Sequence, residues 1–194
     1  MPELLMSRLA RPIHFLFAAV LALPVIAPHA GAQQRDGVVG DLMADIQQVR
    51  EKFVALAKAM PEDKYDWRPA AGVRSVREVF LHVASDNYLL PSAFGVAPDP
   101  ATGIKGDDFG TLATFEHQKL GRDATVAAVE QSFDHLAKAM REFPDDKLPA
   151  TYKVFGQEFT GQRIWILTAT HLHEHLGQGI AYARSNNVVP PWSK

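Results

Sequence analysis

The stretch "QRIWILTATHLHEHLGQGIAYARS", residues 162–185, is predicted to form one long helix, which the following "NNVVPPWSK" ends. With about 100° of rotation per residue, one line along this helix carries apolar or small side chains first and polar ones further on. Such a change is typical of the inner face of a helical bundle where a site interrupts the core. The residues on this line are Ile164, Thr168, His171, His175, Gln178 and Tyr182.

The histidines of "HLHEH", residues 171–175, do not all face the same way. His171 and His175 are about 40° apart and one turn from each other, and two imidazoles so placed can bind one metal ion. His173 is about 200° from His171 and points away from the pair. The motif therefore predicts one pair of metal ligands and one unrelated histidine, although an isolated pair at this spacing also arises by chance.

A protease interpretation of the same stretch has less support. The letters match H-x-x-E-H, a pattern in which the glutamate beside a zinc ligand acts as general base, here Glu174. Proteases with that pattern take a further acidic zinc ligand downstream, but residues 176–194 contain no Asp or Glu. Glu174 also lies about 80° from the midline of the histidine pair, so it reaches only the rim of a site. We assign no catalytic residue from the sequence.

Three earlier helices are predicted from apolar residues at steps of three and four. The first covers about residues 38–60, and the second covers about residues 75–90. Ser75 and Glu78 form a capping box at the start of the second helix. The third helix begins with Asp123 as its N-cap.

The connections complete the prediction of an all-α four-helix bundle. Residues 91–110 are rich in Pro and Gly, and we interpret them as a long crossover connection rather than a lid. A short helix is expected at residues 112–120, and residues 148–161 form a small β-hairpin or an extended loop. The letters "LAKAM" at residues 56–60 recur at residues 136–140, which indicates two helical hairpins packed together, with chance similarity as the alternative.

His82, in the second predicted helix, is the candidate third metal ligand. If the second and fourth helices face each other, His82 meets His171 and His175 in a three-histidine site with open positions for water. Asp86 follows one turn later and either orients His82, adds a carboxylate ligand, or simply faces solvent. The remaining histidines of the domain, His117 and His135, are interpreted as surface residues.

The first residues are typical of a secretory signal peptide. Arg8 and Arg11 precede a short apolar run at about residues 13–26, and "AGA" ends at Ala32. The run is shorter than the roughly 20 residues of a membrane span and contains a proline, so a retained anchor is the less favoured alternative. We expect cleavage after Ala32 and a periplasmic or secreted protein that has no membrane segment after cleavage.

Residues 33–194 suffice for one domain with a sizeable core. The formal net charge of the chain is −2, and without a basic run we expect no nucleic-acid partner. The chain has no cysteine, which excludes disulfides, thiolate nucleophiles and cysteine-ligated metals. The available chemistry therefore rests on histidines, carboxylates, hydroxyls or a metal ion.

Three segments resemble the DinB/YfiT-like family of helical-bundle metal proteins. They are "YDWRP" at residues 65–69, "RSVREVFLHVASDN" at 74–87 and "HLHEHLGQGIAYARSNNVVPP" at 171–191. The resemblance implies a four-helix bundle in which His82, His171 and His175 bind a divalent metal. Zinc is the first expectation, with nickel, iron or manganese as alternatives. Some members look like thiol-dependent transferases or isomerases, which fits an exported protein poorly because small thiols are mainly cytosolic.

Three functions are compatible with these features. The first is a metal-dependent hydrolase or transferase acting on a small molecule, with Gln178 and Tyr182 available to hydrogen-bond a ligand. The second is a non-enzymatic metal-binding or stress-related envelope protein. The third is a helical scaffold for dimerisation, and a homodimer is compatible with all three. A crevice that is open beyond the metal favours the enzyme, whereas a sealed site favours the second function.

Overall fold

The computed structural model of the protein describes residues 35–106 and 108–193. The predicted signal peptide, residues 1–32, lies outside the described residues. Within the described part of the chain, no helix combines the length and the apolar character that a membrane crossing requires.

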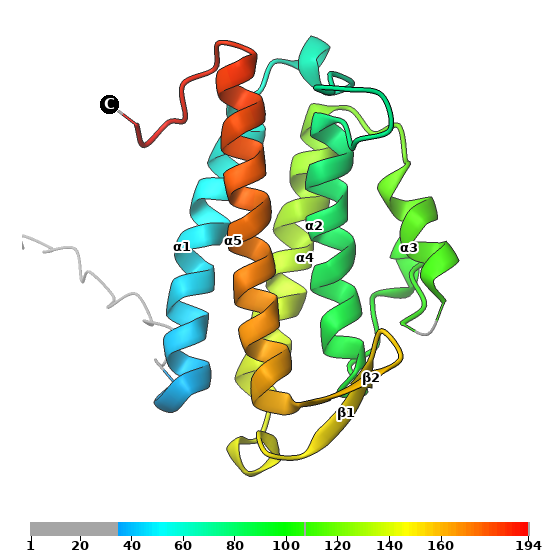
Figure 1. The fold of residues 1–194 in the computed structure, drawn as a ribbon, viewed down its shortest axis with the longest axis vertical. Helices are drawn as coiled ribbons and strands as arrows, with labels where there is room; N and C mark the ends of the chain where they lie inside the picture. Colours follow the sequence, from blue (N-terminus) through cyan, green and yellow to red (C-terminus); the bar gives the residue numbers. More distant parts are fainter. Residues whose placement is uncertain (1–34, 107, 194) are drawn as a thin grey trace, which may run out of the picture. The chain divides into compact units, whose positions relative to one another are not determined.

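Four long helices form a bundle (Figure 1). They are α1 Gly37–Ala59, α2 Val76–Ser92, α4 Arg122–Glu142 and α5 Gly161–Ser185. α1 and α5 run in one direction and α2 and α4 in the other, as the colour order along each ribbon of Figure 1 shows. α1 packs against α4 and α5, and α2 packs against the same two helices. The predicted all-α four-helix bundle is confirmed.

Consecutive helices do not pair as hairpins. Because α1 and α2 each pack mainly against α4 and α5, they occupy opposite corners of the bundle, and so do α4 and α5. The prediction of two helical hairpins packed together is therefore wrong. The link at residues 60–75 is long enough to carry the chain across the end of the bundle, and each helix still buries its apolar face against two neighbours.

The parallel neighbours α2 and α4 require a connection that returns the chain along the length of the bundle. Residues 93–121 provide it and include the 3-10 turn Pro100–Thr102 and the helix α3, Phe109–Glu116. α3 packs against α2 and starts three residues earlier than the predicted short helix. The crossover interpretation of residues 91–110 is confirmed.

The start of α2 is as predicted, but the start of α4 is not. The backbone N–H of Ser75 donates to Glu78 Oε2 (2.7 Å) and that of Glu78 donates to Ser75 Oγ (3.3 Å), which confirms the capping box. At α4 the N-cap is Gly121, and Asp123 lies in the first turn. The prediction of Asp123 as N-cap is wrong because a distant side chain, Glu62 Oε2, accepts the first free N–H at 2.8 Å.

The predicted hairpin consists of β1, Thr151–Val154, and β2, Gln157–Thr160, which pair antiparallel. Its turn contains two residues, Phe155 and Gly156, with φ values of 54° and 73°. Two positive φ angles in a two-residue loop define a type I′ turn, the turn whose twist matches that of a hairpin.

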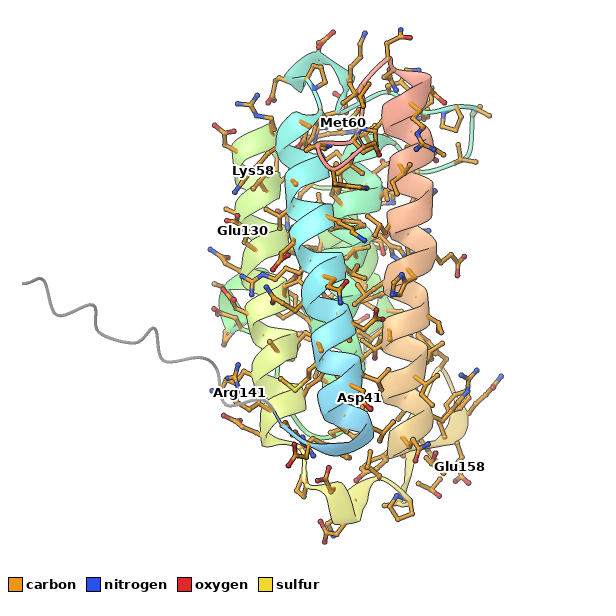
Figure 2. All side chains as sticks on the ribbon, turned by 90° about the vertical axis from the view of Figure 1, so that its left-hand side faces the viewer. Asp41, Lys58, Met60, Glu130, Arg141 and Glu158 are labelled. Atoms are coloured by element: carbon orange, nitrogen blue, oxygen red, sulfur yellow. The ribbon has the colours of Figure 1, made fainter. Side chains whose placement is uncertain are left out.

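The core fills the space between the four helices, to which all of them contribute side chains (Figure 2). On the outside, Lys58 of α1 and Glu130 of α4 form an ion pair at 2.8 Å. α2 is covered by α4, α5 and α3, and every residue from Val76 to Pro91 is buried except His82. The largest fully buried side chains are Trp165, Tyr65, Phe53, Phe80 and Phe133.

Candidate metal centre

The packing of α2 against α5 brings three histidines together. His82 of α2 faces His171 and His175 of α5, and one ligand nitrogen of each lies within 4.8 Å of the other two. The Nε2 atoms of His171 and His175 are 3.1 Å apart. His173 is exposed and contacts Asp45 of α1 at 2.7 Å, on another face of α5, as the helical geometry predicts.

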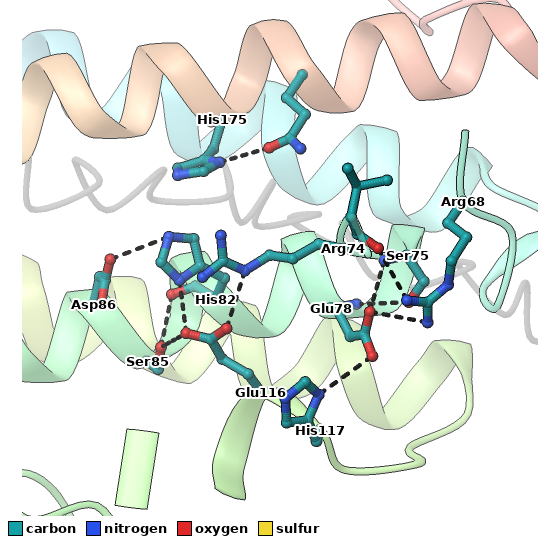
Figure 3. Close-up of polar contacts among 12 residues, drawn as sticks. Arg68, Arg74, Ser75, Glu78, His82, Ser85, Asp86, Glu116, His117 and His175 are labelled. Atoms are coloured by element: carbon teal, nitrogen blue, oxygen red, sulfur yellow. Dashed lines mark hydrogen bonds and ion pairs between the residues drawn. The ribbon is translucent and has the colours of Figure 1, made fainter. Parts of the chain in front are cut away.

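A chain of hydrogen bonds fixes the tautomer of His175. The Tyr182 hydroxyl donates to the carbonyl oxygen of Arg74 (3.1 Å), and the Gln178 amide nitrogen donates to the Tyr182 hydroxyl (3.1 Å). The amide oxygen of Gln178 therefore faces His175 Nδ1 at 2.8 Å, and Nδ1–H donates to it (Figure 3). The lone pair of His175 Nε2 is left for the cluster.

His82 is oriented in the same way by Glu116 of α3. His82 Nδ1 lies 2.7 Å from Glu116 Oε1, and Arg74 Nε donates to the other carboxylate oxygen at 3.0 Å (Figure 3). Burial opposes ionisation of Glu116, but the hydrogen bond from His82 and the charge of Arg74 lower its pKa overall. Because an ionised carboxylate only accepts hydrogen bonds, Nδ1 carries the proton and Nε2 is available to a metal.

Glu116 belongs to the candidate site but was not predicted from the sequence. Nothing in its local sequence distinguishes it from a surface glutamate at the end of a short helix. Its side chain reaches His82 only because the crossover places α3 against α2. One feature of the sequence could have indicated it: Glu116 is a carboxylate near the end of the crossover connection, which must run alongside the bundle.

Asp86 lies on the ligand side of the histidines. Its Oδ2 atom is 3.0 Å from His171 Nε2 and 3.4 Å from His82 Nε2. The residue is buried, so the solvent-facing alternative is wrong, and burial raises the pKa of Asp86 to about 6. Asp86 therefore lies on the Nε2 side of the rings, where a metal ligand would lie, whereas Glu116 contacts the Nδ1 side of His82.

The donor set fits a divalent metal ion. Two nitrogens bound to one ion at about 2.0–2.1 Å are roughly 3.0–3.4 Å apart, and the Nε2 atoms of His171 and His175 are separated by 3.1 Å. Burial, together with His175 and His82, lowers the pKa of His171 to about 4, and burial also lowers that of His175. Both rings are therefore neutral near pH 7, the form that binds metals.

A cavity of about 830 Å³ opens beside the cluster. Residues of α3 and Phe155, at the tip of the β-hairpin, form part of its wall. Tyr182, expected to contact a ligand, is only 8% exposed and instead holds Gln178 from behind. Glu174 is exposed on α5. The polar residues of the cavity wall include Arg74, His82, Asp86, Glu116, His171 and Gln178.

The two remaining histidines differ from each other. His117 is exposed, as predicted. His135 is half-buried against Tyr88, with ring centroids 4.9 Å apart, so its prediction as a surface residue is wrong. Burial lowers the pKa of His135, and its Nε2 atom is buried without a hydrogen-bond partner among the described residues. It lies on α4 and is not part of the three-histidine cluster.

Comparison with known families decides the relationship. The family model described as the DinB superfamily matches residues 45–178, which include the three histidines and Glu116. The chain belongs to the DinB superfamily. The resemblance inferred from the sequence motifs is therefore confirmed, and this DinB member carries its histidine cluster within the matched region. A search of curated proteins found no significant match.

Solved structures of DinB-like proteins share the fold. A DinB-like protein from Bacillus cereus is 13% identical with a TM-score of 0.65, over 79% of this chain and 95% of that chain. A DinB-like protein from Bacillus subtilis is 16% identical with a TM-score of 0.59, over 79% of this chain and 97% of that chain. An uncharacterised protein from Clostridium difficile is 13% identical with a TM-score of 0.57, over 77% of this chain and 98% of that chain. At these identities the likeness concerns the fold alone.

Proposed function

We propose that this DinB member is an exported metal-dependent hydrolase or transferase that acts on a small molecule. His82, His171 and His175 would hold one divalent ion, with zinc as the first candidate and nickel, iron or manganese as alternatives. The observation that carries the proposal is the convergence of the three rings, two of which are fixed from behind so that Nε2 is free.

The residues around the cluster are suited to chemistry as well as to binding. A divalent ion at such a centre polarises a substrate oxygen or activates water. Asp86 Oδ2, 3.0 Å from His171 Nε2, is placed to bind the ion or to take up a proton. The guanidinium of Arg74 lines the cavity and suits an anionic group of a substrate.

The open cavity favours an enzyme over a metal store or a dimerisation scaffold. A volume of about 830 Å³ is within the range of about 300–1,000 Å³ that is usual for small-molecule sites. A protein that only retained a metal would have no need of this space beside the ligands. A scaffold would need neither the cavity nor the hydrogen bonds that orient the rings.

Cobalt(II) loading tests whether coordination positions are open. The visible absorption of the cobalt-loaded protein is recorded while azide is added. We expect a saturable change in the absorption bands, because three protein ligands leave a coordination position for the anion. A spectrum that azide does not change would show a closed site and would contradict the enzymatic proposal. His173→Ala, which removes an exposed histidine that contacts Asp45 and does not line the cavity, is the matched control and should respond like the wild type.

Export is proposed from the first 32 residues alone. The full-length chain is expressed in a Gram-negative bacterium, and the protein in the periplasmic fraction is analysed by intact mass. We expect a mature protein that begins at Gln33. Recovery of the protein only in the cytoplasm, with Met1 or Pro2 as its first residue, would contradict export.

A further inference from the structure

A second cavity of about 600 Å³ adjoins the cavity of the metal centre. It lies between the crossover segment after α2 and the tip of the β-hairpin. The apolar side chains of Leu89, Phe109 and Phe155 line both cavities. The two cavities therefore meet at these three apolar side chains.

The conformation of Phe155 is unusual for a phenylalanine. It occupies the first position of the type I′ turn with φ = 54°, where Asn is preferred and a bulky side chain is sterically unfavourable. Burial does not offset this strain, because Phe155 is 50% exposed. A strained and exposed aromatic residue beside a cavity points to a role in binding rather than in folding.

Phe109, the first residue of α3, completes the same surface. It is 54% exposed, and its ring is stacked on that of Phe155 with centroids 5.9 Å apart and planes 29° apart. The two rings come from segments far apart in sequence and form one aromatic surface along both cavities. Arg74 lines the first cavity beside the histidines, where its Nε donates to Glu116 at 3.0 Å while its side chain remains 41% exposed.

We propose that Phe109 and Phe155 bind an aromatic ring of the substrate, while an anionic, metal-coordinating group of the same molecule reaches the histidines beside Arg74. This inference rests on the proposed metal-dependent function and adds the substrate class: a small aromatic molecule with an oxygen-rich acidic head. An apolar ring gains affinity on this surface by leaving water and by stacking on the two phenylalanines.

Two hydroxamates test the proposal because they share a metal-binding head and differ in one phenyl ring. The zinc-loaded protein is titrated calorimetrically with benzohydroxamate and with acetohydroxamate. We expect benzohydroxamate to bind about 10- to 100-fold more tightly, from the apolar area that the ring buries. Phe155→Asn should reduce this ratio by about 3- to 10-fold and leave the affinity for acetohydroxamate unchanged. Equal affinities in the wild type, or an unchanged ratio in the variant, would overturn the proposal.

Phe155→Asn also separates binding from folding. Asparagine tolerates the left-handed conformation, so the variant should melt about 2–4 °C higher than the wild type while it loses the preference for the phenyl ring. Phe155→Tyr keeps an aromatic ring at this position and should keep the wild-type ratio of benzohydroxamate to acetohydroxamate affinity. Val189→Asn, at a position that is 69% exposed and lines neither cavity, should change neither the affinity ratio nor the melting temperature. A lower melting temperature with an unchanged ratio would make Phe155 a structural residue and overturn the proposal.

A metal-free measurement distinguishes failure of this inference from failure of the metal centre. If neither hydroxamate binds, the metal-dependent function fails, and 1-anilinonaphthalene-8-sulfonate is titrated into the metal-free protein instead. A dye affinity that falls by about 3- to 10-fold in both Phe109→Ala and Phe155→Asn supports the aromatic surface. An unchanged dye affinity overturns it. A concentration-dependent dimer that Phe155→Asn dissolves would also overturn it, because a second copy of the chain would then be the occupant.

Discussion

Replacing Glu116 by glutamine tests whether the residue behind His82 tunes the metal centre. The wild-type carboxylate accepts from His82 Nδ1 at 2.7 Å and is buried with a lowered pKa, so the bond is charge-assisted. A glutamine oxygen can still accept this bond, but as a neutral partner. The difference between a charged and a neutral hydrogen bond is about 1–2 kcal/mol. We therefore expect zinc affinity to fall by about 5- to 30-fold.

The assay is a competition titration with a chromogenic chelator at pH 7.5, on protein purified without a histidine tag. Glu174→Gln is the matched control: it makes the same chemical change beside His175, but its side chain is exposed on α5. The zinc dissociation constant of the control should stay within about twofold of that of the wild type. The H-x-x-E-H interpretation, in contrast, would require Glu174 to be functional. A dissociation constant of Glu116→Gln within about twofold of the wild type, or an equal loss in the control, would refute the orienting role of Glu116.

Three further measurements test the capping box of α2, the buried histidines and Tyr182. Although burial opposes it, the hydrogen bond from the Ser75 backbone helps to lower the pKa of Glu78 to about 2. Because the pKa of Glu78 in the folded protein lies below the ordinary value, ionised Glu78 stabilises the fold above about pH 4.5. This contribution disappears as the pH falls toward 2. The free energy of unfolding of Glu78→Gln should therefore be about 2–3 kcal/mol lower than that of the wild type at pH 7. Measured by urea denaturation at a series of pH values, it should also fall less steeply than that of the wild type as the pH is lowered. Zinc affinity should fall less steeply between pH 7.5 and 5.5 than the roughly 1,000-fold expected of three ordinary imidazoles, because burial lowers the pKa of His171 to about 4 and also lowers that of His175, so that protons compete less with the metal. An isothermal titration series checks this slope. Tyr182→Phe should weaken zinc binding by less than about tenfold in the chelator assay, because the Tyr182 hydroxyl contacts Gln178 and only Gln178 contacts the His175 ring.

The parts of the structure that depend on local geometry could be predicted from the sequence. The common face of His171 and His175 and the outward direction of His173 follow from helical rotation alone. The capping box of α2 is likewise encoded within four residues. His82 required one additional assumption, that α2 faces α5, and the structure has this packing.

The parts that depend on contacts between distant segments could not be predicted. The link between α1 and α2 has a length that permits either adjacent or diagonal helices, so their order around the bundle was not determined by sequence. Glu62 caps α4 from a different turn, which made a local search for an N-cap misleading. Glu116 reaches His82 only after the crossover is in place. Non-local packing decides all three features.

The metal content of the purified protein is the most direct test of the three-histidine centre. The protein is prepared without a histidine tag and analysed by inductively coupled plasma mass spectrometry, beside His82→Ala, His171→Ala and His175→Ala, with His173→Ala as the control. We expect about one divalent ion per chain in the wild type and the control, and less than about a tenth of that in each of the three variants. A wild-type protein without metal, or a His82→Ala variant that retains it, would contradict the three-histidine centre.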